Sequence, residues 1–209
     1  MLRSWYDLVA TYTGIAFLTV AGLPLTAPAV GILGYRRRAA GTPPEWARRS
    51  ALADVGMVYG TVWFVWMTML PGSRPGEVPG RLSLVPLADL PTMGWPGIVG
   101  NLLGLAALGC FAPMRFAAVA SLPRVLALAA GCSILIETAQ FVLQLDRVSS
   151  VDDVLLNTAG AVLAASASRR WWRTRGGRAG AVPAAPSGPA AISAPPADRS
   201  SPAAPRMIE

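Results

Sequence analysis

Four polar residues interrupt the apolar stretches in the second half of the chain: Asn101, Glu137, Gln140 and Asn157. Glu137 and Gln140 lie three residues apart, and Asn157 follows Asp153 by four residues, so each pair shares one face of a helix. A charged side chain at the centre of a bilayer costs at least ~2.5 kcal/mol. The carboxylate of Glu137 therefore calls for a specific role, because a Gln would serve equally well in simple packing.

These residues are expected to come together in space. At a rise of about 1.5 Å per residue, Asn101, Gln140 and Asn157 each lie roughly 6 to 7 Å inside the end of their helices. We expect one shared space in the outer half of the membrane, faced by Asn101, Glu137, Gln140, Asp153 and Asn157, with Arg147 and Asp152 at its outer rim. Two interpretations remain open: a binding or functional site, or a hydrogen-bond network that only holds the helices together.

The residue types limit the chemistry of such a site. A deep carboxylate could act as a general acid or base, and Asp152 and Asp153 could hold a cation or a second proton. The chain has no His, no P-loop and no dinucleotide fingerprint, and Cys110 and Cys132 both lie inside apolar runs. We therefore expect no metal and no cofactor, leave the catalytic residues undefined, and favour a protein that is not an enzyme.

The elements that position these residues are long apolar runs. Hydrophobic residues make up 53% of the 209 residues and charged residues only 14%, whereas a soluble domain has about 25% charged residues. The runs cover about residues 8–34, 51–70, 96–114, 122–145 and 150–168, and a bilayer crossing needs about 20 residues. The sequence predicts an all-α, polytopic transmembrane helix bundle with about five spans.

Local signals refine this picture. The stretch from Ser150 to Asp153 is typical of a capping box that starts the last helix. Gly160 continues the polar face of that helix and would allow close helix approach. The loop over residues 71–96 is rich in Pro and Gly with an apolar centre, which favours a short surface helix or a re-entrant turn. Asp54, near the start of the second run, is interpreted as an interfacial residue.

The basic residues predict the orientation. All 18 are Arg, the net charge is +7, and they gather between the first two spans, between the third and fourth, and after the fifth. The positive-inside rule then places the N-terminus outside and the C-terminus in the cytoplasm. Membrane lipids are the expected partners, and nucleic acid is not, because no soluble fold with a basic patch is predicted.

The polar pattern resembles the VanZ-like family of bacterial membrane proteins, whose signature is Ser, Glu-x-x-Gln, Arg, Asp-Asp and Asn-x-x-Gly. The matching residues are Ser133, Glu137, Gln140, Arg147, Asp152, Asp153, Asn157 and Gly160. Asn101 and the segment 84–87 resemble an earlier span and a Pro loop of the family. Departures from the family pattern, which bear mainly on kinks and packing, are Ser83, Leu105, Ala107 and Ala164.

The resemblance implies a multi-pass protein of the cell membrane. The founding member lowers susceptibility to the glycopeptide teicoplanin. We therefore expect a protein of cell-envelope biology that influences glycopeptide susceptibility through an outer-leaflet polar pocket for a lipid-linked or cell-wall component. The alternatives are a membrane-embedded enzyme with Glu137 as general acid or base, and a structural membrane protein without a catalytic site.

Three regions are predicted along the chain. Residues 1–75 form a two-helix transmembrane region, and residues 76–170 form the VanZ-like three-helix transmembrane region. Residues 171–209 begin with Trp171 and Trp172 as an interfacial anchor and continue as a cytoplasmic tail. The tail is rich in Ala, Pro, Gly and Ser and has no aromatic residue after position 175, so disorder is expected.

Overall fold

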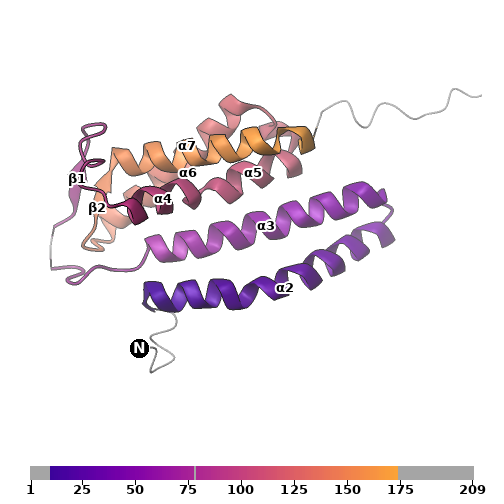
Figure 1. Cartoon of the computed structure of the whole chain (residues 1–209), viewed down its shortest axis with the longest axis horizontal. Helices are drawn as coiled ribbons and strands as arrows, with labels where there is room; N and C mark the ends of the chain where they lie inside the picture. The colour runs from indigo at the N-terminus through magenta and orange to yellow at the C-terminus, as the bar shows by residue number, and fades with distance from the viewer. Residues whose placement is uncertain (1–9, 78, 174–209) are drawn as a thin grey trace, which may run out of the picture. The chain divides into compact units, whose positions relative to one another are not determined.

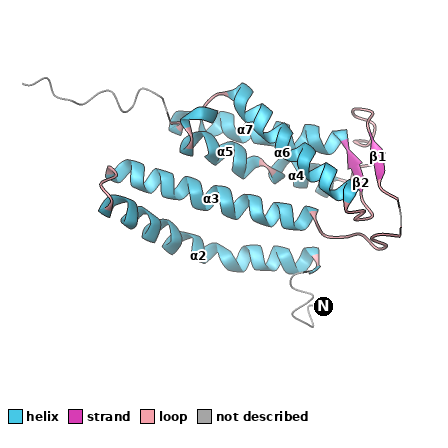
Figure 2. Cartoon of the chain, turned by 180° about the vertical axis from the view of Figure 1, so that it is seen from behind, coloured by secondary structure: helices cyan, strands magenta, loops and turns pink. Residues whose placement is uncertain are grey.

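The computed structural model describes residues 10–77 and 79–173 and shows a helix bundle (Figure 1). The helices are α2 (Tyr12–Ala39), α3 (Pro44–Thr68), α4 (Trp95–Gly104), α5 (Ala106–Arg115), α6 (Leu122–Val142) and α7 (Val151–Ser168). The shorter elements are the 3₁₀ turns η1 (Ala117–Val119) and η2 (Arg169–Trp171) and the strands β1 (Arg81–Ser83) and β2 (Val148–Ser150). Figure 2 shows that helices dominate the described chain. The expected disordered tail lies outside the described residues.

Four helical segments are long and apolar enough to cross a membrane: α2, α3, Trp95–Arg115 and α6. Their outer faces expose large apolar side chains such as Leu25 and Leu135, which are about 70% exposed and suit contact with lipid. α7 is the fifth long helical segment, but it is not among these four. It has 18 residues and carries Asp152 and Asp153 in its first turn. The prediction of an all-α transmembrane bundle is confirmed, while the sidedness stays a prediction.

α2 and α3 form a helical hairpin. α2 starts at Thr11, whose hydroxyl accepts a hydrogen bond from Gly14 N at 3.0 Å, and it continues through Pro24 and Pro28. The turn after α2 contains Gly41 at φ +87°, a conformation that costs glycine little. Figure 1 shows the two helices side by side along their length, and α3 also packs against α4 and α5.

The third predicted span is interrupted rather than continuous. α4 ends at Gly104, Leu105 leaves helical geometry at φ −104° and ψ 11°, and α5 begins at Ala106. The backbone at Gly104 is crowded, because a Cβ there would lie 2.2 Å from Phe64 and 2.8 Å from the amide oxygen of Asn157. A polar side chain of α7 therefore reaches the point where the third span breaks.

α7 lies at the centre of the packing and contacts α4, α5 and α6. A Cβ on Gly160 would lie 1.8 Å from the carbonyl oxygen of Leu102, and one on Gly109 would lie 2.1 Å from that of Ala161. Both glycines thus permit backbone-to-backbone contact, as expected for helices in membranes. The expected close approach at Gly160 is confirmed.

The loop before α4 contains a strand rather than a surface helix. β1 pairs with β2 in parallel, with Arg81 opposite Val148, Leu82 opposite Ser149 and Ser83 opposite Ser150. Helical periodicity cannot reveal such a short ladder, which depends on a partner about 70 residues away. The ladder fastens this loop to the start of α7.

Candidate functional site

Glu137 is the centre of a polar cluster at the strand-bearing end of the bundle. Its side chain on α6 is 9% exposed, and Oε2 accepts a hydrogen bond from Ser150 N at 3.1 Å. Its backbone carbonyl accepts a second bond, from Ser149 Oγ at 2.9 Å. Glu137 therefore ties α6 to β2 through both its side chain and its main chain.

Ser150 is the N-cap of α7, and its hydroxyl accepts from Asp152 N at 3.1 Å. The predicted capping box is only half formed. Ser150 N binds Glu137 and not Asp153, and the Asp153 carboxylate accepts from the amide of Asn101 on α4. The tertiary partners compete successfully with the local return bond, which frees Asp153 to connect α7 with α4.

Asp152 holds the loop before α4 in place. Its carboxylate accepts hydrogen bonds from Leu87 N at 2.5 Å, Asp89 N at 2.8 Å and Leu90 N at 3.3 Å. The residue lies at the start of α7, where the rim was predicted, but it is 1% exposed. Asp152 thus acts on the loop backbone and does not face solvent.

Asn157 lies one turn deeper than Asp153 on the same helix. Its amide Nδ2 donates to Ser133 Oγ on α6 at 2.9 Å, so α6 and α7 are joined at a second level. Its Oδ1 is buried and has no hydrogen-bond partner among the described residues. An unpaired buried acceptor costs about 1 to 3 kcal/mol, so this oxygen is a polar group that the described chain leaves unsatisfied.

Gln140 and Arg147 point toward the end of α3. Gln140 Nε2 donates to Thr68 O at 3.0 Å, and Arg147 donates to Leu70 O at 3.4 Å and to the hydroxyl of Tyr12. Gln140 therefore joins α6 to α3 and makes no described bond to Asp153 or Asn157. Arg147, by contrast, interacts electrostatically with both Glu137 and Asp153.

Asp89 also belongs to this cluster, although it was not among the predicted site residues. Its carboxylate accepts from Ser150 Oγ at 2.5 Å, and the hydroxyls of Ser150 and Ser83 hold the pKa of Asp89 below its usual range. These bonds therefore persist at neutral pH and are lost only as the pH falls through that lowered pKa. The signal that could have found Asp89 is its place just after the Pro loop that resembles the family pattern.

We call this assembly the Glu137 cluster. Its members are Asp89, Asn101, Ser133, Glu137, Arg147, Ser150, Asp152, Asp153 and Asn157. It combines carboxylates from α6, α7 and the loop before α4 with one guanidinium, a set that can bind hydroxyl or amine groups or carry a proton. Within residues 10–77 and 79–173, no three His, Cys, Asp or Glu side chains group as a metal site.

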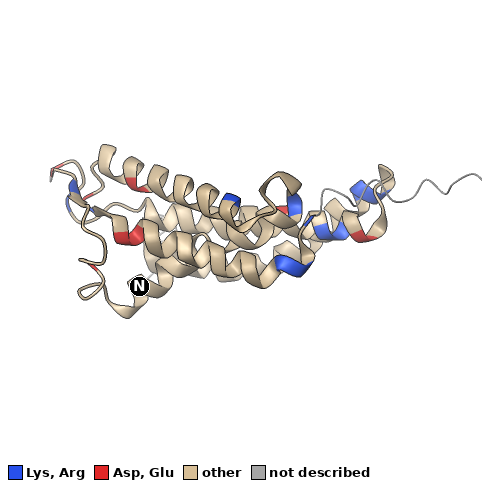
Figure 3. Ribbon diagram, turned by 90° about the horizontal axis from the view of Figure 1, so that it is seen from above, with Lys and Arg blue, Asp and Glu red and all other residues tan. Residues whose placement is uncertain are grey.

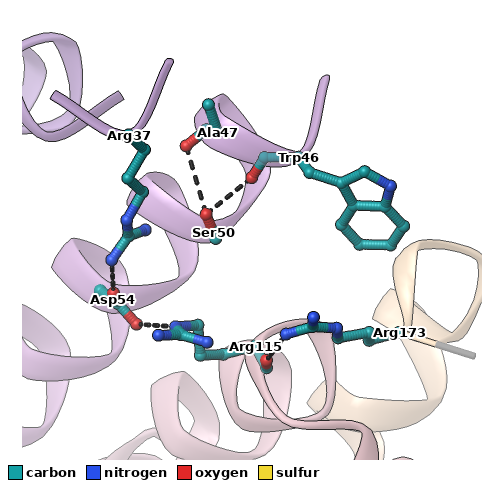
Figure 4. A network of polar contacts seen from close by, with 7 residues as sticks. All are labelled: Arg37, Trp46, Ala47, Ser50, Asp54, Arg115 and Arg173. Atoms are coloured by element: carbon teal, nitrogen blue, oxygen red, sulfur yellow. Dashed lines mark hydrogen bonds and ion pairs between the residues drawn. The ribbon is translucent and has the colours of Figure 1, made fainter. Parts of the chain in front are cut away.

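A second polar network lies at the other end of the helices (Figure 4). Asp54 on α3 forms ion pairs with Arg37 of α2 and with Arg115 of α5, the latter at 2.7 Å. Arg173 donates to the carbonyl of Arg115 at 3.3 Å. Asp54, interpreted as interfacial, therefore links three helices and gathers the predicted basic zones at one end.

Figure 3 shows most arginines at this end of the bundle, away from the strands. Arg170 and Arg169 lie over the rings of Trp171 and Trp172 at 4.0 and 6.0 Å, a cation–π arrangement that suits a membrane interface. The charge separation between the two ends agrees with the pattern on which the predicted orientation rests.

Comparison with known proteins gives one match. The model of the VanZ/LLP1 family matches residues 57–172, which is more than half of the chain and includes every residue of the Glu137 cluster. No curated protein and no solved structure matches the chain significantly. With its long apolar helices, this chain is a membrane protein that belongs to the VanZ/LLP1 family.

Proposed function

We propose that this VanZ/LLP1 family member is a multi-pass protein of the cell membrane that acts in cell-envelope biology. In this proposal the Glu137 cluster binds a lipid-linked or cell-wall component at the outer leaflet. Binding there changes the susceptibility of the cell to glycopeptides of the teicoplanin type. The proposal covers a binding role, with no catalytic step assigned to the chain.

The observation that carries the proposal is the buried carboxylate of Glu137. It is held between α6 and β2, with Asp153 and Arg147 close enough to interact with it electrostatically. A purely packing role needs no ionisable group, since a neutral amide forms the same bond. A carboxylate beside a guanidinium is suited to a polar ligand that carries both donors and acceptors.

The test is a deletion strain complemented with wild-type protein or with Glu137→Gln. Wild-type protein is expected to restore the teicoplanin response, whereas Glu137→Gln should fail to do so while inserting and accumulating normally. Gln retains acceptor capacity at this position, so packing is preserved and only the charge is removed.

Glu77→Gln is the matched control, because it makes the same change on an exposed loop residue outside the Glu137 cluster. It should complement fully. A Glu137→Gln protein that complements as well as wild type would contradict the proposal and favour the structural role. Normal teicoplanin susceptibility in the deletion strain itself would also count against it.

The proximity of two carboxylates supports a second candidate, a membrane-embedded enzyme. Glu137 and Asp153 interact electrostatically, and one could hold a proton while the other stays charged. In that case lipid extracts of the wild-type and Glu137→Gln strains should differ in a lipid-linked cell-wall precursor. Identical extracts, together with altered susceptibility, would leave the binding role.

A further inference from the structure

A groove on the α2–α3 hairpin combines apolar and cationic side chains far from the Glu137 cluster. It is lined by Val30 of α2 and by Glu45, Arg48, Arg49 and Leu52 of α3. Leu52 is 46% exposed, so part of the apolar floor is open to the surroundings. The groove is therefore available to a molecule that has both an apolar and an anionic part.

The two arginines of the groove form no ion pair within the described chain, and together they outnumber the one acid that lines the groove. Asp54 already pairs with Arg37 and Arg115, and no ion pair joins Arg48 or Arg49 to Glu45 or to any other described acid. The guanidinium of Arg49 lies 5.9 Å from the ring centre of Trp46, which keeps it near the surface. An anion at Arg48 and Arg49 would therefore meet two available cations.

The charged and apolar residues of the groove occur in the same order along the helix as the headgroup and acyl chains of a membrane lipid. Leu52 lies one turn beyond Arg48 on α3, about 6 Å further along the helix axis and toward the middle of the apolar run. Val30 lines the same floor from α2. Cations thus stand at the rim above an apolar floor, and guanidinium groups bind phosphate oxygens in a bidentate manner.

We propose that this groove binds one anionic phospholipid of the membrane. Its phosphate lies at Arg48 and Arg49, and an acyl chain runs along Val30 and Leu52. The carboxylate of Glu45, the acid that lines the groove, accepts a hydrogen bond from a headgroup hydroxyl. Phosphatidylglycerol carries a phosphate and such hydroxyls, whereas the phosphatidylcholine headgroup has a compensating positive charge and no hydroxyl donor.

Native mass spectrometry of the full chain, titrated with either phospholipid, tests the proposal. We expect wild-type protein to retain one phosphatidylglycerol with a preference of about tenfold over phosphatidylcholine, as charge-assisted contacts would give. Arg48→Gln/Arg49→Gln should lose that preference. Arg36→Gln/Arg38→Gln removes the same charge from exposed residues on the hairpin outside the groove, and it should keep the preference.

A second variant separates the groove from diffuse attraction. Val30→Trp fills the apolar floor without changing the charge, and it should lose the bound lipid while its circular dichroism spectrum and thermal midpoint stay as in wild type. Equal losses in the two arginine double variants would overturn the proposal, as would equal retention of the two lipids by wild type. Wild-type binding by Val30→Trp would also overturn it, even if Arg48→Gln/Arg49→Gln failed to fold.

Discussion

Asp152 accepts three backbone hydrogen bonds from the loop before α4, so one carboxylate fixes the chain around the Glu137 cluster. Asp152→Asn would replace one oxygen by an NH2 group, which cannot accept from these amides. A hydrogen bond to a charged group contributes about 1.5 to 3 kcal/mol, so loss of one such bond should loosen the loop. We expect faster hydrogen exchange at Leu87, Asp89 and Leu90 in this variant, with the helices unchanged.

Asp153→Asn is the control for that experiment, because it makes the same change at the next residue. Asp153 binds the side chain of Asn101 and not the loop backbone, so exchange at the loop should stay as in wild type. If both variants loosen the loop equally, the effect belongs to the charge of the region and not to the three amide bonds of Asp152.

Helical spacing alone could predict that Asp153 and Asn157 share a face, but it could not predict their partners. Asn101 was expected to face the same space as Asp153, and its amide donates a hydrogen bond to the Asp153 carboxylate. Gln140 donates instead to Thr68, because the C-terminal end of α3 reaches this part of α6, and no sequence period identifies that neighbour. Helical spacing could not identify Asp89, since Asp89 joins the cluster from a loop, and only its place after the Pro loop pointed to it.

Close helix contact depends on two glycines, and their substitution should be severe. Gly160→Ala would place a Cβ 1.8 Å from the carbonyl oxygen of Leu102, so α4 and α7 must separate. Overpacking of this kind costs about 1 to 3 kcal/mol, and a lower thermal midpoint is expected.

Gly131→Ala on α6 is the comparison, because nothing lies within 4 Å of a Cβ at that position. Alanine favours a helix over glycine by up to about 1 kcal/mol, so this variant should keep or slightly raise the thermal midpoint. A Gly160→Ala protein as stable as Gly131→Ala would show that α4 and α7 are not packed as tightly as described.

Apolar runs and caps were sufficient to predict the helices, but not the break at Leu105 or the β1–β2 pair. The break contains no Pro and no two adjacent Gly residues. It coincides with crowding of Gly104 by Phe64 and Asn157. Both features arise from contacts between elements that are separate in the sequence. The sequence of one element alone therefore cannot predict them. The departure at Leu105 from the family pattern lies at the break itself.

For the molecule as a whole, three basic zones meet at one end through Asp54, Arg115 and Arg173. We predict that this end faces the cytoplasm. Reporter fusions after Arg38, Arg115 and Arg178 should read cytoplasmic, and those after Gly80 and Ser149 should read outside. A cytoplasmic signal at Gly80 would overturn this orientation and would move the Glu137 cluster to the inner side.

The parallel pairing of β1 with β2 also sets an order of events during synthesis. β1 leaves the ribosome before α4, α5 and α6, whereas its partner follows them, so the ladder cannot close until these three helices have entered the bilayer. Until then the backbone N–H and C=O groups of β1 lack their β2 partners. The Glu137 cluster is therefore among the last parts of the protein to mature, and a stalled or truncated chain ending before Val148 cannot complete it, because Ser150, Asp152, Asp153 and Asn157 are missing.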